Sequence, residues 1–304
     1  MFWPFTSNRK ARAAQSERFG PYTILRPIHE GEKAFVYLAR STETGEKAAI
    51  KVYKPNFDRA AHQMRKKYRL RREGEIGLLL NPPAGVDPAT YPIVRTLATG
   101  REGGRPDGAV YIIMEFIEGA SLKGLMTTSD PNLASRRVAI CRECARALDI
   151  VHSHGLVHRD VCPDNFLVNN RWEPKLIDLG FCVPPGMTFE EKTGTVSYMS
   201  PEQISVGPIT PQTDVYGLGA VMYELFTRRP PFTSNIKLGN ERLAQRRNNE
   251  IMDQHLHAKP APPSQIAPDV PPALDAVILK CLEKSPERRY PSMKELMRDL
   301  GEIR

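Results

Sequence analysis

Apolar residues in the first third of the chain occur in short runs separated by turn residues, a pattern typical of β-strands. The predicted strands cover residues 22–28, 35–40, 48–53, 93–97 and 110–116. The second and third of them are joined by the turn Thr44-Gly45-Glu46, so we expect them to pair in antiparallel fashion. The pattern predicts a small, five-stranded antiparallel sheet.

Beyond residue 120 the apolar residues recur at helical steps instead. Residues 136–154 form an amphipathic pattern, and residues 214–226 are apolar nearly all round, which predicts a helix buried on every side. Two last helices are predicted over 273–282 and 292–300. The predicted fold class is therefore α+β, with a sheet-based lobe followed by a larger, mainly helical lobe.

One long helix is predicted within the first lobe, over residues 59–80. Four of its residues share one face: Leu70, Glu73, Ile76 and Leu80. Glu73 is thus a carboxylate on an otherwise apolar face, and a buried charge is costly unless it is paired. Lys51, at the end of the preceding strand, is the expected partner of Glu73, and Glu75, on another face, is the second choice for the carboxylate.

Composition fits a soluble globular protein. The 304 residues are 40% hydrophobic and 26% charged, and no apolar run approaches the about 20 residues of a membrane-spanning helix. Residues 1–19 are polar and basic without periodicity, so we interpret them as a disordered tail rather than a secretory signal. Five cysteines, an odd number, indicate reduced thiols and a cytoplasmic location.

The net charge of +8 is concentrated in one segment, residues 59–72. Its basic residues are Arg59, Arg65, Lys66, Lys67, Arg69, Arg71 and Arg72. They are not interleaved with aromatic residues on a recognisable nucleic-acid-binding module, so we interpret them as a solvated helix face. No nucleic-acid partner is expected, and the sequence predicts no oligomeric state.

The strongest motif lies between His158 and Gly180. It contains His-Arg-Asp at 158–160, Asn165, two short apolar runs joined by a polar turn, and Asp178-Leu179-Gly180. Pairing of the two runs as a hairpin would bring Asp160 and Asp178 together. The pattern resembles the catalytic loop H-R-D-x-x-x-x-N and the metal-binding loop D-[FL]-G of protein kinases.

The resemblance implies roles for these residues. Asp160 would orient the acceptor hydroxyl, while Asn165 and Asp178 would ligate Mg²⁺, a hard cation that takes oxygen ligands. The implied reaction is transfer of the γ-phosphoryl group of ATP to Ser or Thr of a protein substrate.

Residues of the predicted sheet extend the resemblance. Ala49-Ile50-Lys51 is similar to the kinase V-A-I-K strand, which implies that Lys51 holds the α- and β-phosphates and is oriented by Glu73. Residues 29–36 occupy the place of the glycine-rich loop, although only Gly31 and Val36 match its pattern and His29 stands at the first glycine position. The resemblance also places Ile28 at the nucleotide.

Residues 112–119 resemble the kinase hinge, whose main chain reads adenine. Met114 would be the gatekeeper, and the backbone of Glu115 and Ile117 would hydrogen-bond the base. The alternative is an ordinary buried strand that ends at a glycine. The implied organisation is a kinase domain over 20–304, with an N-lobe at about 20–116, a hinge at about 115–120 and a C-lobe at about 120–304.

The activation segment of the family resembles residues 181–202, which close on Ser200-Pro201-Glu202. By this resemblance Glu202 pairs with Arg289, Asp214 anchors the catalytic loop, and Thr195 faces the acceptor residue. Candidate autophosphorylation sites, whose phosphate would pair with Arg159, are Thr188, Thr193 and Ser197. The whole pattern resembles eukaryotic-like serine/threonine kinases, particularly the bacterial members.

One departure is important: Cys162 stands where these kinases carry a lysine two residues after the catalytic aspartate. A thiol cannot supply a cation to the γ-phosphate, and loss of one preorganised donor costs about 10²–10³ in rate. We therefore expect a slow kinase. The alternative is a pseudokinase or nucleotide-binding scaffold, and a small-molecule phosphotransferase is disfavoured by the segment 194–202.

The cysteines allow two further readings. Cys162 and Cys182 flank the two catalytic loops, so a redox switch is one hypothesis and inert buried thiols are the alternative. Cys141 and Cys144 form a C-x-x-C without a second pair or histidines at zinc spacing, which favours core thiols over a metal site.

Overall fold

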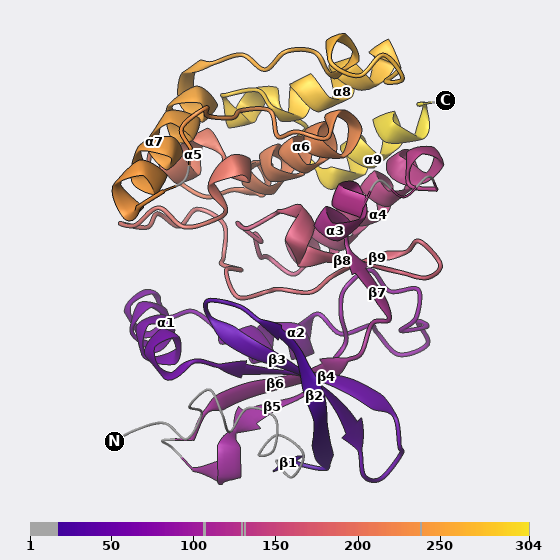
Figure 1. Ribbon diagram of the computed structural model, residues 1–304, viewed down its shortest axis with the longest axis vertical. Helices are drawn as coiled ribbons and strands as arrows, with labels where there is room; N and C mark the ends of the chain where they lie inside the picture. The colour runs from indigo at the N-terminus through magenta and orange to yellow at the C-terminus, as the bar shows by residue number, and fades with distance from the viewer. Residues whose placement is uncertain (1–17, 106–107, 129, 131, 238, 304) are drawn as a thin grey trace. The chain divides into compact units, whose positions relative to one another are not determined.

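The computed structural model describes residues 18–105, 108–128, 130, 132–237 and 239–303 (Figure 1). Nearly all of the predicted tail, residues 1–19, lies outside the described residues. The described chain divides into two compact units. Unit 1 comprises residues 18–89 and 94–118, and unit 2 comprises residues 90–93 and 119–303.

Unit 1 contains a six-stranded antiparallel sheet in the order β1-β2-β3-β4-β6-β5. Its strands are β1 (Arg18–Phe19), β2 (Tyr22–Glu30), β3 (Ala34–Ser41), β4 (Lys47–Tyr53), β5 (Thr96–Arg101) and β6 (Val110–Glu115). Buried side chains on one face form its core, among them Ile24, Ile50 and Ile113. The predicted count of five strands was wrong because the two-residue β1 adds an edge to β2.

The strand predicted at 93–97 is displaced along the chain. β5 begins at Thr96, whereas Ile93 belongs to unit 2 and forms a parallel bridge with Leu176 there. An apolar run shows that a segment is buried, but it does not show against which unit the segment is buried. A short 3₁₀ turn, η2 (Glu102–Gly104), follows β5.

The single long helix predicted over 59–80 was also wrong. Two helices occupy this region, α1 (Pro55–Tyr68) and α2 (Glu73–Leu79). The chain leaves the first helix at Arg69, which adopts the left-handed conformation with φ of 53°, and its N–H bonds the last carbonyls of α1. The second helix restarts with a capping box in which the Arg72 N–H donates to the Glu75 carboxylate over 2.8 Å.

Unit 2 is mainly helical around a small sheet, β7-β8-β9. Its strands are β7 (Gly119–Ser121), β8 (Phe166–Asn169) and β9 (Pro174–Leu176). Its α-helices are α3 (Leu122–Thr128), α4 (Arg137–Ser153), α5 (Pro201–Ile204), α6 (Pro211–Thr227), α7 (Glu241–His257), α8 (Pro272–Cys281) and α9 (Met293–Gly301). The four predicted helices are confirmed as α4, α6, α8 and α9, with ends within three residues of those expected.

Helix α6 forms the centre of unit 2, because every residue from Thr213 to Thr227 is buried. It begins with Pro211 in its first turn and is followed by Arg228, whose φ is 60°.

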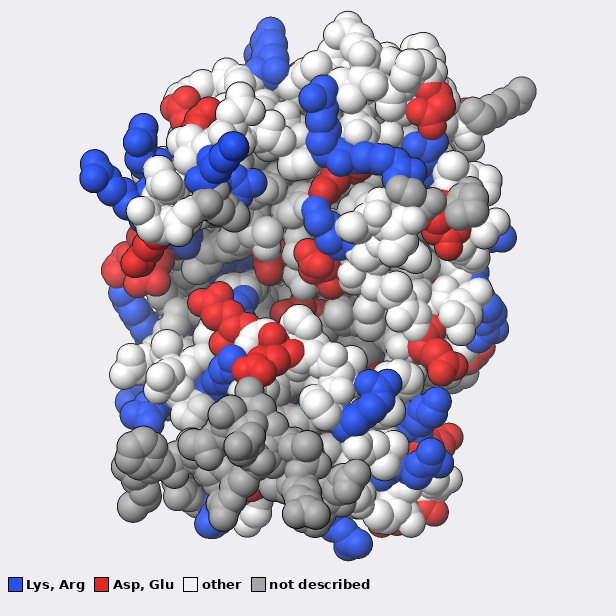
Figure 2. Space-filling model, in the orientation of Figure 1, with Lys and Arg blue, Asp and Glu red and all other residues white. Residues whose placement is uncertain are grey.

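The first part of helix α7 is exposed to solvent. Residues 241–250 include no buried side chain, and Figure 2 shows basic side chains projecting from the surface over this helix. Among the described residues, no helix has both the length and the apolar character that crossing a bilayer requires.

Candidate active site

The β8–β9 hairpin brings the two predicted catalytic loops together within unit 2. Phe166 pairs with Leu176 across the hairpin. The next residue after β9, Ile177, donates its N–H to the carbonyl of Asn165 over 3.0 Å. Asp178 therefore follows directly on a residue that is bonded to Asn165, as expected from the two apolar runs.

Asp214, in the first turn of α6, holds the backbone of the catalytic loop. Its carboxylate accepts the N–H groups of His158 and Arg159 over 2.7 and 2.8 Å, and it also contacts the His152 ring nitrogen at 2.8 Å. Arg159 has a φ of 70°, a left-handed conformation that these bonds help to hold. His158 adds a link that we did not predict, because its Nε2 contacts the carbonyl of Asp178.

Asp160 is buried and fixed by three hydrogen bonds to its side chain. Oδ1 accepts the N–H and the hydroxyl of Thr195, both at 2.9 Å, and Oδ2 accepts from the Asn165 amide at 3.3 Å. Thr195, which was predicted to face the acceptor residue, thus bonds Asp160 directly, a contact that the sequence did not predict. Both carboxylate oxygens therefore have donors, which hold the side chain in this orientation.

Asn165 and Asp178 present oxygen atoms suited to a hard cation. The Asn165 amide nitrogen donates to the Asp160 carbonyl over 2.8 Å and to the Asp160 carboxylate. The amide oxygen therefore lies on the opposite side. Asp178 is half-buried and one of its oxygens accepts the Gly180 N–H over 3.0 Å. This pair of oxygen donors fits Mg²⁺, which retains water and phosphate oxygens in the rest of its shell.

Cys162 is buried next to this network. Burial, followed by the negative charge of Asp160, raises the pKa of its thiol to about 12, although a hydrogen bond with Thr195 acts in the opposite direction. The thiol is therefore in its neutral form at neutral pH, and only 3% of the residue is exposed, which favours the interpretation as an inert buried thiol. Cys182, the second half of the redox hypothesis, is likewise buried and carries no disulfide.

The cysteines of the C-x-x-C in α4 are core residues. Cys141 and Cys144 are 1% exposed, and burial raises the pKa of both thiols. Within the described part of the chain, no group of three or more His, Cys, Asp or Glu side chains is arranged to hold a metal ion.

Lys51 and Glu73 form the predicted ion pair in unit 1. Lys51 Nζ lies 2.8 Å from Glu73 Oε1, and the side chains are 12% and 7% exposed. Glu75, the second choice, is exposed and caps its own helix instead. The sequence analysis missed Tyr53, whose hydroxyl donates to the other oxygen of Glu73, although its position two residues after Lys51 places it on the same strand face.

The β2–β3 connection carries the residues compared with the glycine-rich loop. Gly31 donates its N–H to the Ala34 carbonyl over 3.0 Å, so the turn is tight. Ile28 is 41% exposed, and Val36 is half-buried and pairs with Lys51 across β3 and β4. These three positions stay predictions as nucleotide contacts.

In the segment compared with the hinge, Met114 is buried, at 8% exposure. The N–H of Glu115 already bonds the Arg95 carbonyl at 2.9 Å, and its side chain accepts the Arg95 N–H at 2.9 Å. An adenine would therefore have to be read by the Glu115 carbonyl and the backbone of Ile117.

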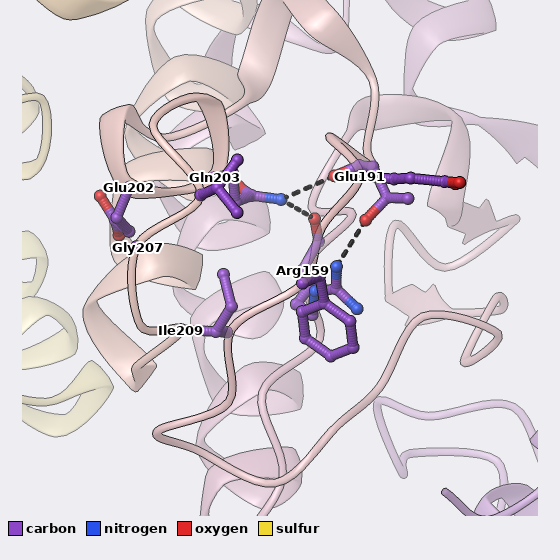
Figure 3. A pocket seen from close by; sticks show the side chains of 9 residues that line it. Arg159, Glu191, Glu202, Gln203, Gly207 and Ile209 are labelled. Atoms are coloured by element: carbon purple, nitrogen blue, oxygen red, sulfur yellow. Dashed lines mark hydrogen bonds between the residues drawn. The ribbon is translucent and has the colours of Figure 1, made fainter. Parts of the chain in front are cut away.

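A small pocket in unit 2 surrounds Arg159 (Figure 3). The guanidinium donates to the Thr193 hydroxyl and lies 3.7 Å from the centre of the Phe189 ring. Gln203, another residue that the sequence analysis missed, donates to the carbonyls of Arg159 and Thr193 over 2.7 and 3.1 Å. Figure 3 shows the Glu191 side chain pointing away from Arg159. Thr193 is thus the predicted phosphorylation site whose hydroxyl contacts this arginine.

The expected pair of Glu202 and Arg289 is bidentate, with both distances at 2.8 Å. The Thr213 hydroxyl also donates to Glu202 over 2.8 Å. Burial opposes ionisation of this carboxyl, yet the hydrogen bonds and the charge of Arg289 prevail and lower its pKa. This pair closes the activation segment onto the body of unit 2.

Comparisons with known proteins agree with this geometry. The sequence is 34% identical over 277 residues to serine/threonine-protein kinase PknB of Mycolicibacterium smegmatis, covering 89% of this chain and 41% of the relative. It is 34% identical over 286 residues to serine/threonine-protein kinase PknD of Mycobacterium tuberculosis, covering 92% of this chain and 39% of that relative. The chain thus spans about two fifths of the length of these curated relatives.

The family match covers most of the chain. The protein kinase domain family matches residues 22–300, which include both units and both catalytic loops. The α+β fold predicted from the sequence, with a sheet-based unit and a mainly helical one, is the fold of this family. The chain therefore belongs to the protein kinase family and resembles its bacterial serine/threonine members.

Proposed function

We propose that this chain is the catalytic domain of a protein kinase that transfers the γ-phosphoryl group of ATP to Ser or Thr of a protein substrate. The observation that carries the proposal is the fixed carboxylate of Asp160, whose oxygens are held by Thr195 and Asn165. Phosphoryl transfer requires little covalent chemistry from the protein, but it requires a carboxylate that aims the acceptor hydroxyl.

In this proposal Asp160 orients the acceptor oxygen and receives its proton. The bond from that oxygen to the γ-phosphorus forms while the bond to the β,γ-bridging oxygen breaks, and ADP leaves. Asn165 and Asp178 would hold Mg²⁺, which supplies positive charge to the phosphate oxygens. Lys51, held by Glu73 at 2.8 Å, would bind the α- and β-phosphates.

We expect the reaction to be slow. The side chain at position 162 is a thiol, which carries no positive charge at any pH, and its pKa of about 12 keeps it neutral. One preorganised charged donor contributes about 10²–10³ in rate. Introducing a lysine by Cys162→Lys should raise the transfer rate by about tenfold or more, with Cys162→Ser as the control that adds no charge. An unchanged rate in a folded Cys162→Lys protein would contradict this explanation.

Autophosphorylation at Thr193 is part of the proposal, since its hydroxyl already contacts Arg159. A phosphate there would carry up to two negative charges next to the guanidinium and would stabilise the activation segment. Thr188 and Ser197 remain the other candidates. The five cysteines are buried and form no disulfide, which supports a reducing, cytoplasmic environment for the domain.

The deciding experiment is transfer of radiolabelled phosphate from ATP to a generic basic protein and to the chain itself, with and without Mg²⁺. Mass spectrometry should place the label on Ser or Thr, and any self-labelling on Thr193. The rival is a pseudokinase, which Cys162 and the single glycine of the β2–β3 turn favour. Mg²⁺-dependent ATP binding without transfer would establish the rival and contradict the proposal.

A further inference from the structure

The ion pair of unit 1 has a third member. Tyr53 lies two residues after Lys51 on β4, so both side chains project from the same face of the sheet. Lys51 Nζ contacts Glu73 Oε1 at 2.8 Å, and the Tyr53 hydroxyl donates to Glu73 Oε2. Each oxygen of this buried carboxylate therefore has its own donor from the strand.

The Tyr53 ring is itself held in place. It stacks on Phe57 in the first turn of α1, with ring centres 6.0 Å apart and planes 10° from parallel. Lys51 Nζ lies 5.4 Å from the centre of the Tyr53 ring, within the range of a cation–π contact. Replacing the hydroxyl alone would leave both ring contacts possible.

Glu73 needs such a donor because its helix is short and separate. Helix α2 has seven residues and is disconnected from α1 by the left-handed Arg69. It sits close on β5 through two glycines: a Cβ at Gly74 would lie 2.4 Å from the Thr99 hydroxyl, and one at Gly77 would lie 2.2 Å from the Thr96 hydroxyl. These contacts fix the helix on the sheet, while the direction of the Glu73 side chain depends on its two donors.

We propose that Tyr53 is a positioning residue, which holds Glu73 in the orientation that pairs with Lys51. Through Glu73 it sets the place of the Lys51 ammonium. The consequence for activity rests on the proposed kinase function, whereas the consequence for Lys51 itself does not.

The kinetic test is Tyr53→Phe, which removes the hydroxyl and keeps the ring. We expect kcat/KM for ATP to fall by about tenfold, with little change in thermal unfolding. Tyr22→Phe, on β2 of the same sheet, is the matched control and should have no such effect. In a Glu73→Gln background Tyr53→Phe should change kcat/KM less than twofold, because the hydroxyl acts through the carboxylate.

A second readout does not need phosphoryl transfer. The acetylation rate of Lys51 by acetic anhydride, followed by mass spectrometry, reports how firmly the amine is held in its ion pair with Glu73. We expect Tyr53→Phe to raise this rate severalfold, Glu73→Gln to raise it further, and the double variant to match Glu73→Gln.

Acetylation of Lys51 at the wild-type rate in Tyr53→Phe would overturn the inference. So would an equal effect of Tyr53→Phe with and without the Glu73 carboxylate. A wild-type protein that transfers no phosphate but shows the expected acetylation pattern would contradict the kinase proposal and support the role of Tyr53.

Discussion

A buried glutamate in each unit, Glu73 in unit 1 and Glu202 in unit 2, is paired with a cation, and these two pairs are built differently. Glu73 in unit 1 is met by Lys51 and the Tyr53 hydroxyl. Glu202 in unit 2 is met by Arg289 and the Thr213 hydroxyl. The plan is the same, a carboxylate in the first turn of a short helix that receives a cation and a hydroxyl.

The difference lies in what the cation does besides binding the carboxylate. Arg289 uses all five of its N–H donors, two on Glu202 and three on the backbone carbonyls of Gln212, Glu283 and Lys284. Its side chain is completely buried. Lys51 is a point charge on a flexible stem, and its side chain retains 12% exposure. The comparison indicates that the pair of Glu202 and Arg289 holds the fold together, whereas the pair of Glu73 and Lys51 can serve chemistry.

The largest expected effect is on the stability of unit 2. Arg289→Ala should destabilise the protein by about 3–5 kcal/mol, because it leaves the buried Glu202 and three carbonyls without their donor. Denaturant unfolding measures the loss. Arg298→Ala is the control, since its contact with Asp299 is exposed and should contribute less than about 1 kcal/mol. Equal losses of unfolding free energy in the two variants would contradict the structural role of Arg289.

The next effect is on activity and sharpens the comparison. Lys51→Met should lower phosphoryl transfer by about 10²-fold or more, because the variant loses the cation that we propose to bind the phosphates. Its unfolding free energy should change less than that of Arg289→Ala, since Tyr53 still donates to Glu73. Transfer assays and unfolding curves on the same preparation test both statements. A Lys51→Met protein that transfers phosphate at the wild-type rate would break the comparison.

A smaller effect on stability is expected from pH, through the buried His255 behind the pair of Glu202 and Arg289. Tyr216 lies under the Arg289 guanidinium and contacts the buried His255 ring over 2.8 Å. Burial, and then the charge of Lys284, lowers the pKa of His255 to about 3. The unfolded chain therefore binds a proton below about pH 6.5 that the folded chain does not, so stability falls as the pH falls.

Between pH 8 and pH 5 the histidine alone should cost about 2 kcal/mol of stability. Unfolding curves at a series of pH values measure the slope for wild type and for His255→Gln. The variant should show a shallower loss over this range even if its stability at pH 8 is lower. A slope identical to that of wild type would show that His255 takes up its proton over the same pH range in the folded and the unfolded protein, which contradicts the lowered pKa.

The smallest effect concerns the turn after Glu202. Val206 has a φ of 60° and is 38% exposed, an unfavourable conformation for a β-branched residue. Val206→Gly should relieve about 1–2 kcal/mol of strain and lose up to about 1 kcal/mol through the more flexible unfolded chain. The thermal midpoint should rise by a few degrees or less. A lower midpoint would contradict the assignment of strain to this residue.

Much of unit 2 could be predicted from the sequence. Its helices have long apolar periods. The two predicted catalytic loops lie at the ends of a hairpin with clear strand residues, so the sequence could predict that the loops of Asp160, Asn165 and Asp178 come together. Unit 1 was harder. The break at Arg69 carries no glycine or proline, and it is set by hydrogen bonds such as that from the Arg65 guanidinium to the Arg71 carbonyl, which no local pattern reveals.

The missed site residues have a common cause. Tyr53, His158 and Gln203 act through contacts with residues far away in sequence, and their types are ordinary in a strand, a loop and a helix. Tyr53 could have been found by asking which side chain shares a strand face with Lys51. Gln203 could not, because its role depends on where the activation segment folds back onto Arg159.

The most direct test of the account compares wild type with Asp160→Asn at matched folded fractions. Both should bind ATP with Mg²⁺ with similar affinity, since the proposed role of Asp160 is to aim the acceptor and not to hold the nucleotide. Wild type should transfer labelled phosphate to Ser or Thr, and the variant should transfer none that can be detected. Transfer by Asp160→Asn at a rate near that of wild type would contradict the role of this carboxylate and, with it, the proposed reaction.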